Sequence, residues 1–476
     1  MSSDRLTGLD ASFLHLEDSA SHMHVAGVML FEGPPPAYED LLEAIERRLG
    51  LVPRYRQRLA SVPLGQGRPK WVDDPHLNLH YHVRSTALPA PGSEEQLKAL
   101  AGRVFAQQLD RDKPLWEIWL VEGLEGDRFA MLSKTHHALV DGISGVDIMS
   151  VLFDTTPEPA APTDTGERWL PRPLPSPAQL FGEALMERAT IPGELVRSVR
   201  AVFRGPRMVL EGVRDAAVGV GAMAWAGLNP APATPYNKSI GPHRRYTWMR
   251  ANLADLKAIK NEFGGTVNDV VLATVAGALG KHLRRRGQNT DGLELKAMVP
   301  VSVRADVERG ALGNRVAALM APLPVWCQDP VARLDIVREE LKGLKSGGQA
   351  VGAQVLTELS GFAPSTVMGQ ASRLMARQRF FNVVVTNVPG PQIPLYLAGR
   401  RMIDPFPMVP LAKNQGLGIA LLSYAGRINF GLVGDYDVMY DLDDFAIDLQ
   451  DSLAELAAEA GVELTVEANP AQAVRA

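Results

Sequence analysis

The stretch His136-His137-Ala138-Leu139-Val140-Asp141-Gly142 joins a predicted strand to a predicted helix. Before it, side chains from 129 to 136 alternate between two faces with the period of two that is typical of a β-strand. After it, Ser144 is a suitable N-cap, and apolar residues from 146 to 153 recur at helical spacing. We therefore expect the two histidines on a strand-to-helix loop, with their side chains on opposite faces.

The residue types in this stretch suit proton transfer. Histidine is the side chain best placed to take up and return a proton near neutral pH. Asp141 can fix the tautomer of a nearby imidazole or hold the loop, and Gly142 permits a sharp bend. Histidines near apolar strands are more often packed core residues. The pattern alone therefore leaves a catalytic role, a metal-binding role and simple packing open.

Length and composition narrow the class of protein. A chain of 476 residues exceeds one ordinary core, so we expect two domains. The net charge of −5 gives no indication of nucleic-acid binding. A single cysteine, Cys327, excludes an intramolecular disulfide, and the N-terminus lacks a basic and apolar leader. No apolar run reaches the roughly 18–20 residues of a membrane span, so the sequence predicts a cytoplasmic protein.

The sequence divides into three parts. We expect an N-terminal domain over residues 1–155, a proline-rich linker with basic amphipathic helices over 156–240, and a C-terminal domain over 241–476. Hydrophobic periodicity predicts strands at 23–31, 297–303 and 380–388, and a hairpin at 417–424 and 427–433. It also predicts helices at 41–49 and 442–460.

A long helix is predicted to begin after Thr266. Asp269 lies three residues beyond Thr266, in the pattern of a capping box. Three arginines at 284–286 followed by Gly287 predict the helix end, because cations and a C′ glycine are favoured there.

Four arginines in the linker recur at steps of three and four: Arg197, Arg200, Arg204 and Arg207. Apolar residues fall largely on another side of the same helix. A solvated charged face is the favoured interpretation, and binding to an anionic membrane surface is the alternative. The apolar run 216–225 would then contact lipid or pack between domains.

The His-His-x-x-x-Asp-Gly pattern is the signature of the coenzyme A-dependent acyltransferase superfamily, which includes chloramphenicol acetyltransferase, carnitine acyltransferases and nonribosomal condensation domains. Four further stretches make the chain resemble the bacterial wax ester synthase/diacylglycerol acyltransferase family within that superfamily. They are Leu6–Leu14 with Met23–Gly27, Pro114-Leu115-Trp116, Asn268-Asp269, and Asn387–Pro391. The resemblance covers nearly the whole chain.

The resemblance implies a fold and an activity. The fold would be a mixed α/β, two-domain, chloramphenicol acetyltransferase-like architecture, with a mixed sheet and helices in each domain and an active-site tunnel between them. The activity would be transfer of a fatty acyl group from acyl-CoA to diacylglycerol, giving triacylglycerol, or to a long-chain alcohol, giving a wax ester. Acyl-CoA would be a co-substrate, and no metal or other cofactor would be needed. A cytoplasmic protein with peripheral contact to a membrane or lipid inclusion is compatible with this activity.

The resemblance also implies roles for individual residues. His137 would take the proton of the acceptor hydroxyl while the hydroxyl oxygen attacks the thioester, and His136 would be the other histidine of the catalytic pair. Asp141 would shape the loop by pairing with an arginine, for which Arg304 is the candidate. Asn268 would donate to the tetrahedral oxygen, but Asn268-Asp269 would serve equally well as a helix cap. Pro114-Leu115-Trp116 would line the acyl channel or, as the favoured interpretation, brace the histidine strand by packing.

Several alternatives stay open. A metal hydrolase could use His136, His137 and Asp141, although adjacent strand histidines rarely converge on one ion. A serine hydrolase is less favoured because Gly142-Ile143-Ser144-Gly145 lacks the nucleophile elbow. A non-catalytic lipid-binding relative, and an acyltransferase for a polyketide or sterol hydroxyl, are the remaining alternatives.

Overall fold

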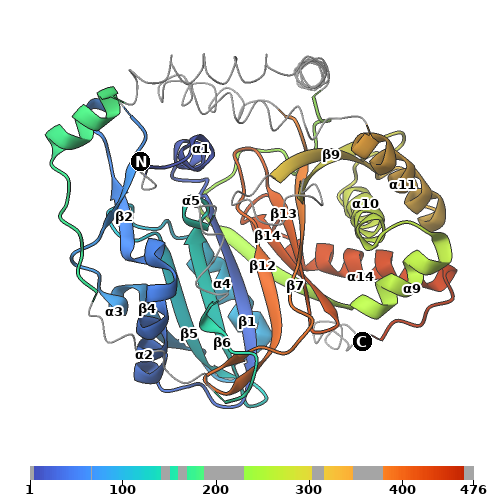
Figure 1. The fold of residues 1–476 in the computed structure, drawn as a ribbon. Helices are drawn as coiled ribbons and strands as arrows, with labels where there is room; N and C mark the ends of the chain where they lie inside the picture. The colour runs from blue at the N-terminus through green and yellow to red at the C-terminus, as the bar shows by residue number, and fades with distance from the viewer. Residues whose placement is uncertain are drawn as a thin grey trace, which may run out of the picture.

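The computed structural model describes residues 5–65, 67–140, 151–158, 169–186, 230–302, 316–346 and 379–465. In this part of the chain, two six-stranded sheets stand side by side, each accompanied by helices (Figure 1). The mixed α/β, two-domain architecture expected from the resemblance is therefore present.

The N-terminal sheet has the strand order β11-β12-β1-β6-β5-β4. All neighbouring strands in it are antiparallel except the β4 and β5 pair. Its strands are β1 (His24–Glu32), β4 (Val83–Ala87), β5 (Trp116–Leu124), β6 (Arg128–His136), β11 (Tyr396–Leu397) and β12 (Arg400–Met408). Two of the six strands, β11 and β12, come from the C-terminal part of the chain. The sheets therefore do not follow the linear division of the sequence.

The helices of the N-terminal half include α1 (Gly8–Leu16), α2 (Tyr38–Arg48), α3 (Leu79–His82), α4 (Glu94–Phe105) and α5 (His137–Val140). Short 3-10 turns lie at Leu49–Leu51, Pro53–Arg56 and Pro63–Gly65, and a small two-stranded sheet joins β2 (Gln57–Ala60) to β3 (Lys70–Asp73). Glu39 and Asp40 occupy the first turn of α2, where negative charge is favoured by the helix dipole.

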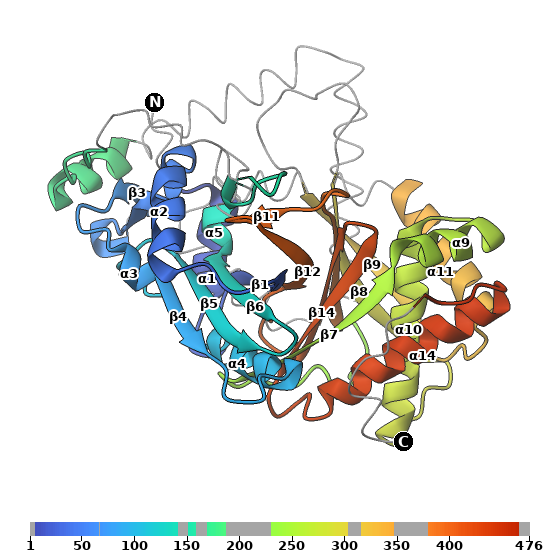
Figure 2. The same cartoon turned by 90° about the horizontal axis from the view of Figure 1, so that it is seen from below.

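The C-terminal sheet has the strand order β7-β14-β13-β10-β8-β9. Its strands are β7 (Arg244–Asn252), β8 (Glu294–Ser302), β9 (Val316–Pro324), β10 (Val383–Pro389), β13 (Leu417–Tyr424) and β14 (Arg427–Asp435). The predicted hairpin is confirmed, since β13 and β14 are antiparallel around Ala425-Gly426. The helices α9 (Leu253–Phe263), α10 (Val267–Arg285), α11 (Pro330–Ser346) and α14 (Leu442–Glu459) gather on one side of this sheet (Figure 2).

The cap signals read for α10 are confirmed. The Thr266 hydroxyl accepts from the Asp269 amide, and the Asp269 carboxylate accepts from the Thr266 amide. At the other end, the amide of Gly287 donates to Arg284 and the amide of Gln288 donates to Leu283. Gly287 has a φ of +71°, so the helix ends in a Schellman motif. Most of α10 is buried, which makes it the central helix of the C-terminal core.

A hydrophobic cluster joins the two halves. It combines Phe105 of α4 with Tyr246 and Trp248 of β7 and Phe406 of β12. Above it, the Glu94 carboxylate of α4 accepts from Arg250 of β7, whose guanidinium also donates to Asp404 of β12. Apolar packing and buried charge pairs thus fix the relative position of the two sheets.

The proline-rich stretch 154–177 is described in part. Residues 169–176 have no regular structure, as predicted, whereas 177–186 are helical. Pro177 is the first residue of that helix, a position where its missing N–H costs nothing, and the Ser176 hydroxyl accepts from the Gln179 amide. Among the described helices, no single one has the length and apolar character of a membrane span. Only α9 and α10 taken together, across a bend of 96°, reach them.

Candidate active site

His136 is the last residue of β6 and is packed inside the protein. Its amide donates to the Leu115 carbonyl at 2.9 Å, and its side chain is 1% exposed. Its Nδ1 accepts from the Ala138 amide at 3.1 Å, so the proton of the neutral ring lies on Nε2. This Nε2 faces the Glu17 carboxylate at 3.7 Å. His136 is therefore held by a hydrogen bond at Nδ1 and lies within ion-pair distance of Glu17 at Nε2.

His137 has different surroundings. It begins α5 and is only half-buried, and its amide donates to the Met23 carbonyl at 2.8 Å. Its imidazole stacks on the Phe13 ring of α1, with centroids 4.0 Å apart and an interplanar angle of 23°. His136 is therefore buried, whereas His137 is half-buried.

Glu17 supplies the negative charge beside the pair. It accepts from Arg111 Nε at 2.9 Å, and its side chain is 1% exposed. Burial by itself raises the pKa of this carboxyl, but the contacts with His136 and Arg111 outweigh burial and hold the pKa at about 2. Glu17 is thus a fixed anion at neutral pH.

Pro114 and Leu115 lead into β5, which begins at Trp116 and pairs with the histidine strand, and all three residues are buried. The Leu115 carbonyl accepts from His136, and Trp116 pairs with Thr135 of β6. The Trp116 indole donates to the Tyr55 carbonyl at 2.9 Å and stacks on His82 at 4.6 Å. These contacts brace the end of β6, in keeping with the favoured packing interpretation.

Asn268 and Asp269 lie in the other domain, at the N-terminus of α10. Asp269 is 4% exposed and serves as the helix cap described above. Asn268 is half-buried, and no other described residue forms a hydrogen bond with its side chain. Capping therefore accounts for Asp269, while the predicted donation by Asn268 to a tetrahedral oxygen stays a prediction.

Several predicted residues lie outside the described part of the chain. They are Asp141, Gly142, Ser144, the basic residues Arg197, Arg200, Arg204 and Arg207, the run 216–225, and Arg304. Within the described part, no three His, Cys, Asp or Glu side chains are grouped closely enough to hold a metal ion.

Sequence reasoning missed Phe13, Glu17 and Arg111. The sequence did hold one indication of their importance: Phe13 lies inside the first N-terminal stretch that resembles the family, and Glu17 lies between the first and the second. Periodicity could not place them, because α1 meets α5 only in the folded chain, more than 100 residues away in sequence.

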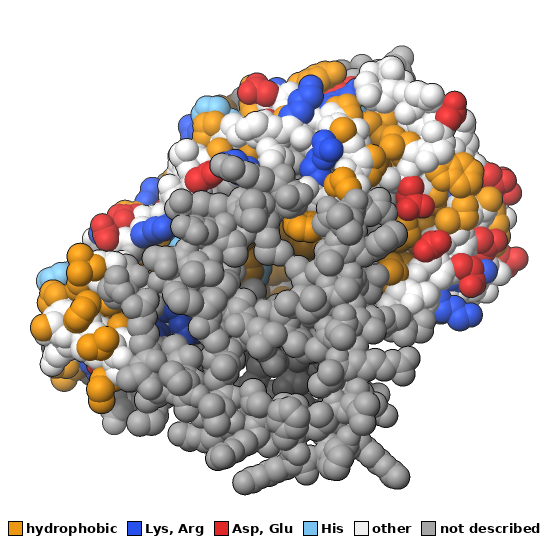
Figure 3. Space-filling view, turned by 90° about the horizontal axis from the view of Figure 1, so that it is seen from above, with side chains coloured by type: hydrophobic (Ala, Val, Ile, Leu, Met, Phe, Trp, Pro, Cys, Tyr) orange, Lys and Arg blue, Asp and Glu red, His pale blue; other side chains and the backbone are white. Residues whose placement is uncertain are grey.

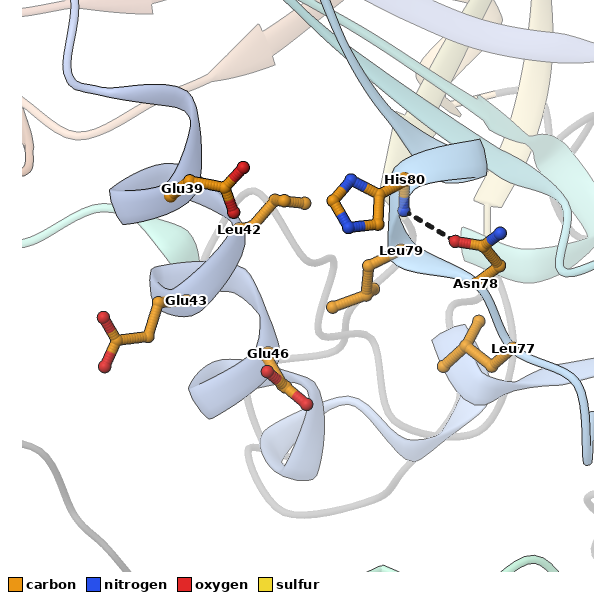
Figure 4. A pocket seen from close by; sticks show the side chains of 8 residues that line it. All are labelled: Glu39, Leu42, Glu43, Glu46, Leu77, Asn78, Leu79 and His80. Atoms are coloured by element: carbon orange, nitrogen blue, oxygen red, sulfur yellow. Dashed lines mark hydrogen bonds between the residues drawn. The ribbon is translucent and has the colours of Figure 1, made fainter.

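A separate pocket of about 540 Å³ lies between α2 and residues 77–80 (Figure 4). Glu39, Glu43 and Glu46 of α2 line its rim, and Leu42, Leu77 and Leu79 supply apolar walls. In this pocket the His80 amide donates to the Asn78 side chain at 3.0 Å. None of the predicted site residues lines it.

Comparison with known proteins identifies the family. Residues 6–271 match the model of the wax ester synthase/diacylglycerol acyltransferase catalytic domain, and residues 312–457 match that of the family's C-terminal domain. A probable diacylglycerol O-acyltransferase of Mycobacterium tuberculosis is 35% identical over 462 residues, which cover 96% of this chain and 96% of the relative.

Solved structures agree with this assignment. The wax ester synthase/diacylglycerol acyltransferase from Marinobacter aquaeolei VT8 superimposes with a TM-score of 0.65 at 27% identity, covering 96% of this chain and 100% of that one. The starter condensation domain of rhizomide synthetase, solved in complex with C8-CoA, has a TM-score of 0.56 at 14% identity, with 97% and 96% coverage, and so shares the fold. The chain therefore belongs to the wax ester synthase/diacylglycerol acyltransferase family.

Proposed function

We propose that this protein transfers a fatty acyl group from acyl-CoA to diacylglycerol or a long-chain alcohol, with His137 as the general base. Family membership supports the acyltransferase activity and its triacylglycerol or wax ester products. The observation that carries the assignment of the base is the contrast within the pair: His136 is packed against Glu17, and His137 is half-buried on Phe13.

The reaction needs one group that both accepts and donates a proton. A hydroxyl is a weak nucleophile until its proton is removed. His137 takes this proton as the oxygen bonds to the thioester carbonyl carbon. When the carbon–sulfur bond breaks, the same imidazolium gives the proton to the departing sulfur, leaving an ester and free coenzyme A. Because no acyl-enzyme is required, both substrates must be bound together.

The substitution His137→Ala tests the base. We expect acyl transfer from labelled palmitoyl-CoA to fall by about 10²–10⁴-fold, because the general base is lost. The acceptor panel should contain a fatty alcohol, diacylglycerol and a sterol, with products separated by chromatography. His76→Ala, which alters an exposed histidine, is the matched control and should retain activity. A nearly normal rate in folded His137→Ala would refute the assignment of His137.

We further propose that the protein contacts an anionic lipid surface through the arginines 197, 200, 204 and 207. Their spacing places them on one helical face in the sequence. The segment just before them also favours lipid contact, because Leu170, Leu185 and Met186 are 77%, 60% and 72% exposed. Hydrophobic side chains gather at the left edge of the molecule in Figure 3, where Figure 1 draws the helical segment 177–186.

Charge reversal of Arg197, Arg200 and Arg204 to Glu tests this contact. Each arginine near an anionic surface contributes about 1 kcal/mol, so partitioning onto phosphatidylglycerol vesicles should weaken by at least about tenfold. Neutral phosphatidylcholine vesicles provide the reference. Equal partitioning of the wild-type and reversed proteins would leave a solvated charged face as the explanation of this segment.

A further inference from the structure

Three contacts hold His137: the Met23 carbonyl, the Phe13 ring and the helix turn next to His136. Glu17 interacts with Met23 and His136, and it lies at the end of the helix that contains Phe13. The Met23 carbonyl accepts from the His137 amide, and the Met23 amide donates to Glu17 Oε1 at 3.3 Å. Phe13, which stacks on His137, lies on α1, and Glu17 is the C-cap residue of this helix. The amide of Glu17 donates to the Phe13 carbonyl at 3.2 Å, so the carboxylate and the stacked ring belong to one helix end.

The third contact involves His136. Its Nε2 faces Glu17 Oε2 at 3.7 Å, and its Nδ1 accepts from the Ala138 amide in the first turn of α5. The anion favours the tautomer with a proton on Nε2, and this tautomer leaves Nδ1 free to accept. A carboxylate on one side of His136 thus fixes the helix turn that carries His137 on the other side.

Arg111 holds the Glu17 carboxylate from outside. Besides its bond to Glu17, its guanidinium donates to the Leu14 carbonyl at 2.9 Å, so it ties the carboxylate to the last turn of α1. Arg111 is 43% exposed at its side chain, whereas Glu17 is 1% exposed. Arg111 therefore lies between the buried Glu17 carboxylate and solvent.

We propose that Glu17 is a positioning residue for His137, acting through His136 and Met23. This inference rests on the proposed role of His137 as the base. Glu17 neither touches the reacting atoms nor exchanges a proton in the reaction. It determines whether the His137 ring is held where the hydroxyl of the acceptor must lie.

Glu17→Gln tests the proposal because it keeps the size of the side chain and an oxygen for the Met23 amide but removes the charge. We expect kcat to fall by about 10–100-fold, the range found when such supporting contacts are lost, with KM for palmitoyl-CoA changed by less than about threefold. If Glu17→Gln does not fold, Glu17→Asp, which keeps the charge but shortens the side chain, is measured in its place with the same expectation for kcat.

Asp73→Asn is the matched control. Asp73 is also buried, at 7% exposed, and its carboxylate accepts from Arg172 Nη2 at 3.0 Å. Burial raises the pKa of Asp73, but bonds from Arg172 and Gln57 hold the pKa at about 2, as in Glu17. Asp73→Asn should lower thermal stability to a similar degree while changing kcat by less than about twofold, since it supports β3 and not the histidine pair.

A double-mutant cycle separates positioning from general destabilisation. His136→Asn keeps an acceptor for the Ala138 amide but has no group in the place of Nε2. In this background, Glu17→Gln should lower kcat by less than about threefold, because the path through His136 is already broken. Asp73→Asn should behave the same in both backgrounds.

Two results would overturn the proposal. One is a Glu17→Gln enzyme whose kcat matches that of Asp73→Asn. The other is a full, multiplicative loss of kcat in the His136→Asn background. These failures differ from that of the proposed function: if folded His137→Ala is active, the base assignment falls, whereas an inactive His137→Ala with an unaffected Glu17→Gln removes only the role of Glu17.

Discussion

His282 lies near the C-terminal end of α10 and is fully buried, at 0% exposed. Its Nδ1 accepts from the Tyr236 hydroxyl at 2.8 Å, and its Nε2 faces the Asp441 carboxylate at 3.2 Å. The three side chains connect the segment that enters the C-terminal domain to α10 and to the start of α14. Burial lowers the pKa of His282 to about 4, and the nearby Asp441 opposes this only in part.

The lowered pKa of His282 predicts that the folded protein loses stability in acid. In the unfolded chain His282 has a pKa near its ordinary value of 6.5, so the folded state disfavours its protonation. The stabilisation is present above about pH 6.5 and is lost as the pH falls toward about 4. Between about pH 7.5 and 5, His282 should reduce the free energy of unfolding by about 2 kcal/mol.

Denaturant unfolding of wild type and His282→Asn at both pH values checks this. Asparagine keeps an acceptor for Tyr236 but does not titrate, so the variant should be less stable overall yet lose about 2 kcal/mol less on acidification. His76→Ala should keep the pH dependence of the wild type. Equal acid losses in wild type and His282→Asn would contradict this role for His282.

At the same scale, the sequence located the histidine pair but not its supports. His136 and His137 were found because strand period, glycine and carboxylate all occur within seven residues. The sequence also predicted that their side chains would lie on opposite faces. It could not identify Glu17 or Phe13 as neighbours, because a contact between α1 and α5 leaves no local periodic signal.

At the scale of elements, prediction succeeded where the determinants are local. The ends of α10 follow from Thr266, Asp269 and Gly287, each acting within one helical turn. Strand boundaries were less well defined: the strand expected at 380–388 is β10 at Val383–Pro389, and that expected at 297–303 begins earlier, at Glu294. Strand ends depend on partner strands that are distant in sequence, and no residue pattern within the segment records them.

For the whole molecule, the sequence predicted two sheets but not that β11 and β12 of the C-terminal part would join the N-terminal sheet. Chain order suggests that everything after residue 241 belongs to the C-terminal domain, yet β12 is hydrogen-bonded to β1 over the register from Ala26↔Met408 to Phe31↔Met402. The return of β12 to the N-terminal sheet means that this sheet is not complete in a contiguous half of the chain, whereas all six strands of the C-terminal sheet come from residues after 241. The two halves should therefore unfold together rather than as separate domains.

The two sheets approach each other closely at Gly431 of β14. A Cβ at this position would be 1.7 Å from the Pro407 carbonyl oxygen of β12, and 2.8 Å from the Tyr246 hydroxyl. That hydroxyl donates to the Phe406 carbonyl at 2.8 Å. This hydrogen bond fixes β12 against β7 at the point where β12 passes over Gly431. Only a residue without a side chain fits, because backbone atoms cannot rotate away as a flexible side chain can.

Gly431→Ala should therefore force the two sheets apart. We expect a loss of about 3 kcal/mol or more in the free energy of unfolding, since the added methyl group meets the Pro407 backbone of β12 and the fixed Tyr246 hydroxyl of β7. Gly343→Ala in α11 is the control: a Cβ there meets no atom within 4 Å, and alanine is the better helix former, so stability should stay equal or rise slightly. Chemical unfolding of both variants, followed by a probe in each half, measures the effect. Because β12 links the sheets, both probes in Gly431→Ala should report the same decrease in the denaturant midpoint of unfolding. A decrease reported by only one probe would mean that the crossing does not couple the two halves.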